Sequence, residues 1–201
     1  MHSKKSFSQA CENNQQPILD LLASVFSDTR HVLEIGSGTG QHGVFFSRSL
    51  PHLVWQTSDL LPNHASINAW ISEYSTNNIR SPLTFDADDP TWPYSSVDGV
   101  FTANTAHIMP WLTVERLFKG LPFLLKPNST VVMYGPFKYE GRFTSISNEA
   151  FDKQLRARNP HQGIRDFEAV NKLAQDAGLK MQKDAAMPAN NRLLVWKKDG
   201  V

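Results

Sequence analysis

The sequence contains a single cysteine, Cys11, in 201 residues. One cysteine forms no intrachain disulfide and supplies no cysteine-based zinc site. No apolar run approaches the length of about 18 residues that a membrane-spanning helix needs. Residues 1–6 lead into polar chain rather than an apolar segment, which is not the pattern of a secretory signal. We therefore expect a cytoplasmic protein in a reducing setting.

The sequence also lacks an excess of charge of either sign, with 20 Lys and Arg, 19 Asp and Glu, and a formal net charge of +1. This balance predicts no general attraction to nucleic acid or to an anionic membrane. None of the seven histidines has the spacing of a metal-ligand motif, so we expect no metal site. The oligomeric state cannot be predicted from this composition.

The length and the 40% share of hydrophobic residues are typical of one globular domain. We expect a single domain over residues 1–201, with an N-terminal helical extension at 1–28. Residues 1–14 are predicted to be partly mobile, with Asn14 capping a helix that continues through Pro17. The irregular segment at about 138–165 is predicted to be a lid-like insertion over a ligand pocket.

A glycine-rich turn organises the chain. The apolar run over 32–35 predicts a buried parallel strand, and a helix is expected over about 41–49. Between them, the glycines allow positive φ angles and let a ligand approach the backbone closely. A strand, a glycine turn and a helix N-terminus form a nucleotide-type pocket. The predicted cofactor-binding residues of this turn are Gly36, Ser37, Gly38 and Gly40.

Two kinds of nucleotide fit this turn. The spacing of Gly38, Gly40 and Gly43 matches a dinucleotide fingerprint, so an NAD(P)-dependent oxidoreductase is one alternative. That match leaves Glu34 just before the loop, where a carboxylate repels a pyrophosphate but attracts an ammonium group. S-adenosylmethionine has no phosphate and carries an ammonium group and a sulfonium. The pattern apolar-apolar-Glu-apolar-Gly-x-Gly-x-Gly resembles the first motif of the Rossmann-like class I methyltransferases, which implies that Glu34 helps to hold the methionine part.

Acidic residues follow the next two predicted strands. Asp59 ends the strand expected over 53–59, where nucleotide-binding folds place a carboxylate for the ribose hydroxyls. The alternative is that Asp59 or Asn63 caps the helix expected at about 63–76. Asp86 and Ala87 end a short strand over 82–86, where a carboxylate and a backbone amide would read adenine. The alternative there is an ordinary acidic loop.

The candidate catalytic residues follow the fourth and fifth predicted strands, over 97–104 and 130–134. In open parallel sheets, ligands bind beyond the carboxyl ends of the strands. Asn104 is expected to bond cofactor or substrate, and Tyr134 is a further catalytic candidate. His107 is a candidate general base, with a purely structural hydrogen bond as the alternative.

Four residues are candidates for contact with the methyl acceptor: Trp111, Arg165, Asn190 and Asn191. Trp111 directly precedes a helix expected over about 112–125. Arg165 is the last residue of the insertion and precedes a helix expected at about 166–177. The two asparagines lie between strands predicted over 179–185 and 192–197.

The residues from Glu34 to His42 resemble the signature of a family known as domain of unknown function 938, or methyltransferase-like protein 26. The resemblance continues along nearly the whole chain, at residues 14–19, 55–59, 104–111, 134–137, 148–152, 163–166 and 187–191. The segment 126–129 departs from the usual glycine turn, and His161-Gln162 replaces a common aromatic residue.

This resemblance implies an α/β class I methyltransferase fold, a three-layer Rossmann-like sandwich. Its seven-stranded, mostly parallel sheet has the order 3-2-1-4-5-7-6, with strand 7 antiparallel and helices on both faces. It implies binding of S-adenosyl-L-methionine, with S-adenosyl-L-homocysteine as product.

The combined prediction is an S-adenosylmethionine-dependent methyltransferase with an unidentified acceptor. The expected cover over the pocket favours a small molecule. No Asn-Pro-Pro-Tyr-like tetrad follows the fourth strand, which disfavours methylation of nucleobase or amide nitrogens. A non-catalytic regulatory or scaffold protein that binds the same cofactor is the alternative.

Overall fold

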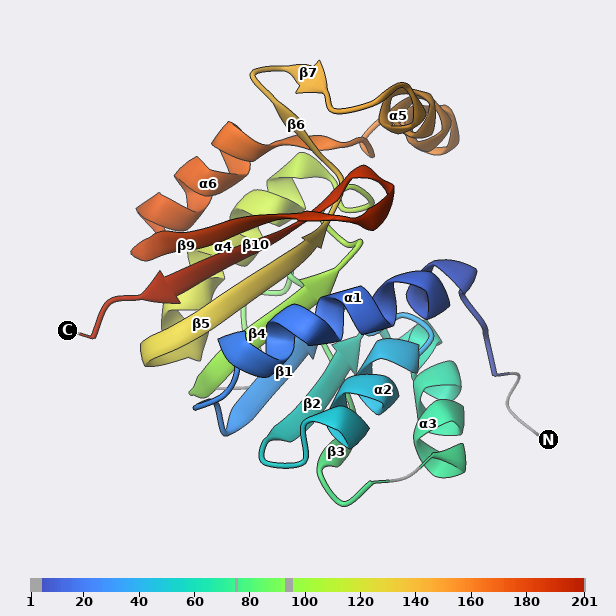
Figure 1. The fold of residues 1–201 in the computed structure, drawn as a ribbon, viewed down its shortest axis with the longest axis vertical. Helices are drawn as coiled ribbons and strands as arrows, with labels where there is room; N and C mark the ends of the chain where they lie inside the picture. Colours follow the sequence, from blue (N-terminus) through green and yellow to red (C-terminus); the bar gives the residue numbers. More distant parts are fainter. Residues whose placement is uncertain (1–4, 75, 93–95, 201) are drawn as a thin grey trace.

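The computed structural model describes residues 5–74, 76–92 and 96–200. Its centre is a seven-stranded sheet with the order β3-β2-β1-β4-β5-β10-β9 (Figure 1). The strands are β1 (His31–Ile35), β2 (Val54–Asp59), β3 (Ile79–Thr84), β4 (Val97–Ala103), β5 (Leu125–Gly135), β9 (Leu179–Met187) and β10 (Asn191–Lys198). Only β10 runs antiparallel to its neighbours, β5 and β9. The predicted fold class and strand order are confirmed, because β10 is the seventh strand of this sheet in chain order and β9 the sixth.

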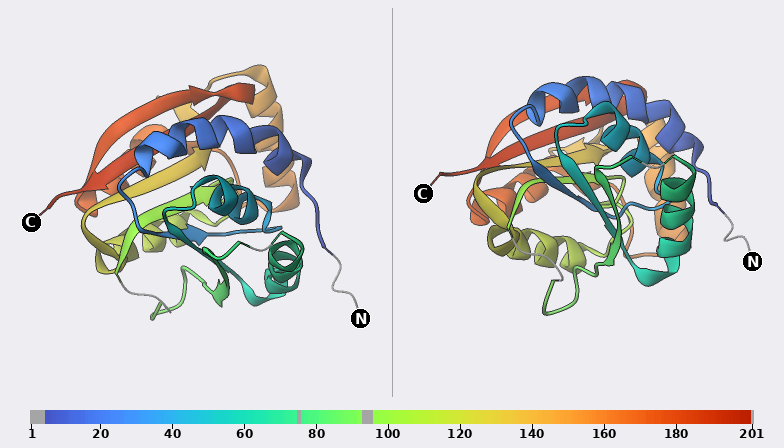
Figure 2. Two further views of the ribbon diagram at one scale, coloured as in Figure 1. Left: turned by 60° about the horizontal axis from the view of Figure 1, so that its bottom comes forward. Right: turned by 90° about the horizontal axis from the view of Figure 1, so that it is seen from below.

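Helices cover both faces of the sheet, as Figure 2 shows. On one face lie α1 (Gln9–Val25) and α2 (Gln41–Ser49), and on the other lie α4 (Trp111–Leu124) and α6 (Phe167–Asp176). A further helix, α3 (His64–Glu73), packs beside β3 and α2. Successive residues of β4 point to opposite faces, so Val100 joins the core under α4 and Phe101 joins the core under α1. The result is the expected three-layer arrangement.

The N-terminal helix differs from its prediction. It begins at Gln9, and the hydroxyl of Ser8 caps it by accepting from the Cys11 N–H. Asn14 is therefore not a cap, and residues 9–14 are helical rather than mobile. The prediction treated Pro17 as a first-turn residue, but Pro17 lies inside the helix. Asn14 is buried there because its side chain bonds His42 of α2.

The insertion forms a small unit beyond the carboxyl end of β5. A three-stranded sheet, β7-β6-β8, consists of β6 (Phe137–Tyr139), β7 (Arg142–Phe143) and β8 (Arg165–Asp166). Helix α5 (Ile146–Arg158) stands over this end of the sheet, across from the start of α1 (Figure 1). Asp152 fixes α5 to the chain that follows it, since its two oxygens accept from Ile164 N at 2.7 Å and Arg156 Nε at 2.7 Å.

The third strand lies earlier in the chain than predicted, over 79–84 instead of 82–86. Ile79 is its buried residue, and the Pro82–Asp86 pattern marks the end of the strand and the loop after it. Two short 3₁₀ helices, η1 (Leu61–Asn63) and η2 (Pro188–Asn190), sit in loops at the same sheet edge. Over the described residues, no helix combines the length and apolarity that a bilayer crossing requires.

Candidate cofactor and acceptor site

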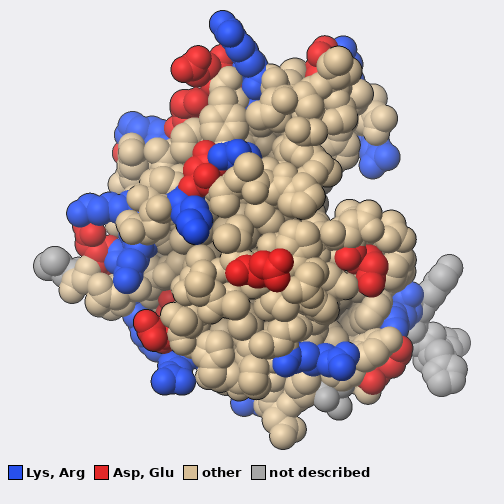
Figure 3. Space-filling view, in the orientation of Figure 1, with Lys and Arg blue, Asp and Glu red and all other residues tan. Residues whose placement is uncertain are grey.

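A cavity of about 950 Å³ lies at the carboxyl ends of the parallel strands. It is lined by the segments that follow β1, β2, β3, β4 and β5, by the first turns of α1 and α5, and by the β9–β10 connection. In the space-filling view, a notch lies between the surface formed by α5 and that formed by the start of α1 (Figure 3). The sequence prediction that chemically rich loops converge at this edge agrees with this arrangement.

The glycine turn forms one wall of the cavity through Gly36, Ser37, Gly38 and Thr39. The N–H groups of Gly36 and Ser37 donate to the carbonyl of Ser58 at 3.0 and 2.9 Å, which fixes the turn to β2. Gly36 has a φ of +75°, and a Cβ there would lie 2.5 Å from Thr105 Cγ2. Gly38 has a φ of +59° and open space where a Cβ would point. The turn therefore needs glycine at both positions and presents its backbone to a ligand.

Gly40 has a different role from the one predicted. Its φ is +96°, and a Cβ would lie 2.8 Å from the Cα of Ile67. Gly40 is also outside the cavity lining. It therefore allows the backbone of α3 to approach the turn, and its predicted contact with the cofactor stays a prediction.

Glu34 also lies outside the cavity lining and is only 2% exposed. Its Oε2 accepts from Ser37 Oγ at 2.9 Å and from Trp55 Nε1 at 3.0 Å. Burial raises the pKa of this carboxyl to about 7, against the lowering effect of the two donors. The predicted contact with an ammonium group is not supported by this position. Glu34 instead stabilises the turn through its bond to Ser37. Glycine at position 43 leaves room for its carboxylate, because a Cβ there would lie 2.8 Å from Glu34 Oε2.

Asp59 lines the cavity at the end of β2 and organises the loops around it. Its Oδ2 accepts from the Gly38 N–H at 2.6 Å, while Oδ1 accepts from Leu60 N and Asn63 Nδ2, both at 2.7 Å. A carboxylate has about four lone-pair directions, so Oδ2 retains one toward the cavity. Neither Asp59 nor Asn63 caps α3 through its side chain, so the capping alternative is wrong. Asp59 instead orders the glycine turn and the loop after β2, and its contact with a ribose stays a prediction.

Asp86 and Ala87 both line the cavity after β3. Asp86 Oδ1 accepts from the Asp88 N–H at 2.9 Å, which shapes the loop. Beside them, Phe85 and Leu60 also line the site and were missed by sequence reasoning. Their position directly next to predicted site acids was the available signal.

His107 lies in the loop after β4 and lines the cavity. Among the described residues, no hydrogen bond reaches the His107 ring. Every side-chain nitrogen or oxygen of these residues that is sealed from solvent does have a hydrogen-bond partner. The ring nitrogens are therefore open to the cavity. Burial, with a smaller contribution from the Arg165 charge, lowers the pKa of His107 to about 4. The imidazole is neutral at pH 7 and keeps an unprotonated nitrogen that can accept a proton.

Asn104 and Tyr134 are brought together by β4 and β5. Asn104 lines the cavity with a φ of +60°, a conformation that asparagine tolerates, and its N–H donates to the Tyr134 carbonyl at 2.8 Å. Burial raises the pKa of the Tyr134 hydroxyl, and the side chains of Asn14 and Asn191 partly offset this effect. Asn14 Oδ1 in turn lies 2.6 Å from His42 Nε2, which donates to it. Helix α1 is thus linked to the cavity floor through polar side chains.

Three predicted acceptor residues lie outside the cavity lining: Trp111, Arg165 and Asn190. The Arg165 side chain donates to the carbonyls of Ala106, Met109 and His161, and its guanidinium lies over the Trp111 ring. These two residues therefore hold the loop that carries His107. Asn190 contributes its backbone carbonyl to an internal bond, and only Asn191 of the four predicted residues lines the cavity.

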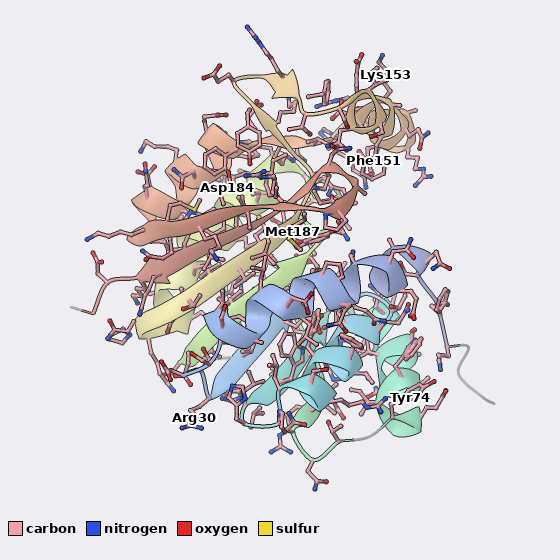
Figure 4. All side chains as sticks on the ribbon, in the orientation of Figure 1. Arg30, Tyr74, Phe151, Lys153, Asp184 and Met187 are labelled. Carbon is pink, nitrogen blue, oxygen red and sulfur yellow. The ribbon has the colours of Figure 1, made fainter. Side chains whose placement is uncertain are left out.

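Helix α5 supplies three cavity residues that were not predicted as site residues, Ser147, Asn148 and Phe151. Figure 4 shows Phe151 on the side of α5 toward the sheet, whereas Lys153 points away. The Phe151 ring meets the His107 ring edge-on at 5.3 Å between centroids. The three-residue spacing of Asn148 and Phe151 on one helix face was the signal that sequence reasoning did not use.

The sequence pattern of the family described as "Protein of unknown function (DUF938)" matches residues 5–198. The chain belongs to this family. Across the described residues of the DUF938 chain, no group of three or more His, Cys, Asp or Glu could hold a metal ion.

Solved structures similar to the DUF938 chain include an O-methyltransferase family protein from Burkholderia thailandensis, with a TM-score of 0.84 and 17% identity over 95% of this chain and 58% of that one. Human N-acetylserotonin methyltransferase, solved in complex with S-adenosylmethionine, has a TM-score of 0.78 and 14% identity over 95% and 53%. Mitomycin 7-O-methyltransferase has a TM-score of 0.79 and 14% identity over 92% and 54%. The DUF938 chain thus has a methyltransferase-like fold and spans just over half the length of these proteins.

Proposed function

We propose that this protein is an S-adenosylmethionine-dependent methyltransferase acting on a small-molecule acceptor. The observation that carries the proposal is the convergence of the glycine turn, Asp59 and the Asp86–Ala87 pair on one cavity. The turn offers exposed backbone at Gly36 and Gly38, and the only carboxylates among the described lining residues follow β2 and β3. This donor and acceptor set fits a ligand with a cationic amino-acid part, a ribose and an adenine. The methyltransferase-like fold supports the same assignment.

Each part of the cavity has a role in this proposal. The turn over 36–39 holds the amino-acid part, Asp59 accepts from the ribose hydroxyls, and Asp86 with the Ala87 N–H reads the adenine. When bound, S-adenosylmethionine supplies an electrophilic methyl group on a sulfonium sulfur. The chain itself must hold the acceptor in line and exclude water. The α1 and α5 residues over the cavity serve that purpose.

His107 is proposed to take the proton that the acceptor's nucleophilic atom loses. Its nitrogen is unprotonated at pH 7 and lies at the cavity, as the role requires, and its lowered pKa makes it a weaker base than an ordinary histidine. Asn104 and Tyr134 are proposed to orient the ligands at the ends of β4 and β5. The Arg165 contacts with the loop keep His107 in place from behind.

The test is isothermal titration calorimetry with S-adenosylhomocysteine, S-adenosylmethionine and NAD, on the native chain and on Asp59→Asn. We expect the two sulfur compounds to bind and NAD not to bind. Loss of a charge-assisted hydrogen bond to the ribose should weaken binding about tenfold or more in Asp59→Asn. Asp20→Asn is the matched control, because Asp20 is exposed on α1 and bonds only Gln16 among the described residues.

Binding of NAD alone would replace the proposal with the oxidoreductase alternative. Binding of S-adenosylhomocysteine without any methyl transfer to small-molecule extracts would favour the non-catalytic binder. An Asp59→Asn affinity equal to that of Asp20→Asn would remove Asp59 from the ribose site.

A further inference from the structure

The cavity has two ends of different electrostatic character. The lining residues include three carboxylates: Asp59 at the end of β2, and Asp86 and Asp88 in the β3–β4 connection. Asp88 is paired with Arg116 at 2.9 Å and with the Thr113 hydroxyl. The carboxylate-bearing end is the one assigned above to the nucleoside. The opposite end is therefore the place for the methyl acceptor.

The acceptor end is built from uncharged groups. Asn14, His107, Tyr134, Asn148 and Asn191 supply its polar side chains, and they come from five separate segments. His107 and Tyr134 are both neutral at pH 7, because burial lowers the first pKa and raises the second. Across the described residues, no lysine or arginine lines the cavity.

Three arginines of the surrounding elements are bound to other groups of the protein. The Arg165 charge contributes to lowering the pKa of His107, but the guanidinium donates its hydrogen bonds to three backbone carbonyls, those of Ala106, Met109 and His161. Arg156 of α5 pairs with Asp152 at 2.7 Å, and Arg192 of β10 pairs with Asp184 at 2.7 Å. A charged ligand of either sign at this end would thus lose its hydration without gaining a charged partner, because the three lining carboxylates belong to the other end.

Asn148 offers a hydrogen-bond acceptor, and no donor, at the acceptor end of the cavity. Its Nδ2 donates both hydrogens inside the protein, to Thr144 Oγ1 at 2.9 Å and to the Asn190 carbonyl at 3.0 Å. The carbonyl partner can only accept, so the amide orientation is determined. Asn148 Oδ1 has no partner among the described residues and is not sealed from solvent. Because Asn148 lines the cavity, we take this free oxygen as the hydrogen-bond acceptor that it offers to a ligand there.

His107 presents a second acceptor near Asn148. The two are linked by Phe151, which is one turn of α5 beyond Asn148 and touches the His107 ring edge-on. The lone pairs of a carboxylate or phosphate would oppose the lone pairs of Asn148 Oδ1 and of the unprotonated His107 nitrogen. A hydroxyl or N–H group would satisfy both.

From these observations we infer that the methyl acceptor is an uncharged small molecule with at least two hydrogen-bond donors and an apolar ring or chain that packs on Phe151. One donor belongs to the nucleophile and faces His107, and the second is read by Asn148. Acids and phosphate esters are excluded by both charge and hydrogen-bond polarity. The inference rests on the proposed function and names the substrate class of that same site.

The experiment separates a protein-free small-molecule extract of the source organism by ion exchange at pH 7.5 into anionic, cationic and neutral pools. Each pool is incubated with the native chain and methyl-labelled S-adenosylmethionine, and label in the products is counted. We expect label only in products of the neutral pool. Label from the anionic or cationic pool overturns the inference. Absence of label from every pool, with S-adenosylhomocysteine still binding, instead refutes the proposed function, and the inference falls with it.

A variant series then tests the role of Asn148 on the labelled neutral fraction. Asn148→Ala should raise the KM for that fraction about tenfold, as expected for one lost hydrogen bond in a closed site. Its affinity for S-adenosylhomocysteine should stay within about twofold of the native value. Thr144→Val is the matched control, because it removes one internal partner of Asn148 but leaves Oδ1 in the cavity. Equal KM values for the native chain and Asn148→Ala, or equal losses in both variants, would overturn the assignment of Asn148.

Discussion

Glu34→Gln tests whether the acid before the glycine turn is a buried support rather than a ligand group. Glu34 is 2% exposed, and its Oε2 is bonded by Ser37 and Trp55. Burial raises the pKa of its carboxyl from an ordinary value of 4.5 to about 7. Glutamine keeps an oxygen for the same two donors but carries no charge. The variant therefore isolates the cost of ionising Glu34 in the folded protein.

The direction of the pH effect follows from proton binding. Between pH 4.5 and 7, the folded chain holds a proton on Glu34 that the unfolded chain has released. The free energy of unfolding of the native chain should therefore fall relative to that of Glu34→Gln as pH rises through this range. The pKa difference corresponds to about 3 kcal/mol in total, at about 1.4 kcal/mol for each pH unit. Above pH 7 the difference between the two chains should become constant.

Urea denaturation of both proteins at half-unit steps from pH 4.5 to 8 measures this difference. Burial lowers the pKa of His42 and of His107 to about 4, so both chains lose stability together as pH falls from 6.5. That shared effect cancels in the comparison. Glu168→Gln, at an exposed position of α6, is the control and should give a flat difference. A pH-independent difference in the free energy of unfolding between the native chain and Glu34→Gln would refute the reasoning. A native chain whose stability rises with pH relative to that of the variant would also refute it.

Two further variants test packing around the site by urea denaturation. Gly36→Ala should lose more stability than Gly178→Ala, by at least about 1 kcal/mol, because both have positive φ but only the first drives a Cβ to 2.5 Å from Thr105 Cγ2; equal losses would contradict this. Asn14→Ala should cost about 1–3 kcal/mol, since it leaves buried His42 without its 2.6 Å partner. Asn13→Ala, on the exposed side of the same helix, should cost less than about 0.5 kcal/mol.

The residues that the sequence predicted for the cofactor include Gly36, Gly38, Asp59 and Asp86, which line the cavity, and they were recognisable because their requirements are local. Gly36 and Gly38 adopt backbone conformations that favour glycine, and Asp59 and Asp86 follow strand ends at recognisable positions. The parallel core also follows from strand and helix alternation. The position of β10 between β5 and β9 came from the family resemblance, since periodicity alone carries no information on strand order.

Positions with long-range partners were harder to predict. Glu34 lies on a strand that is buried on both faces, so the alternation of polar and apolar residues cannot tell which side its carboxylate takes. Trp55 and the approach of Gly43 decided that side. Arg165 was predicted to meet the acceptor, but it bonds carbonyls 59 and 56 residues earlier in the chain.

The sequence by itself determined the fold, the glycine turn and the acids that follow β2 and β3. These features depend on backbone conformation and on residues that are close together in the sequence, so a local sequence pattern is enough to predict them. Only the tertiary structure decided which polar groups face the cavity. The orientation of Asn148 depends on the Asn190 carbonyl, 42 residues away. The neutrality of His107 depends on burial by packing, which no local pattern specifies.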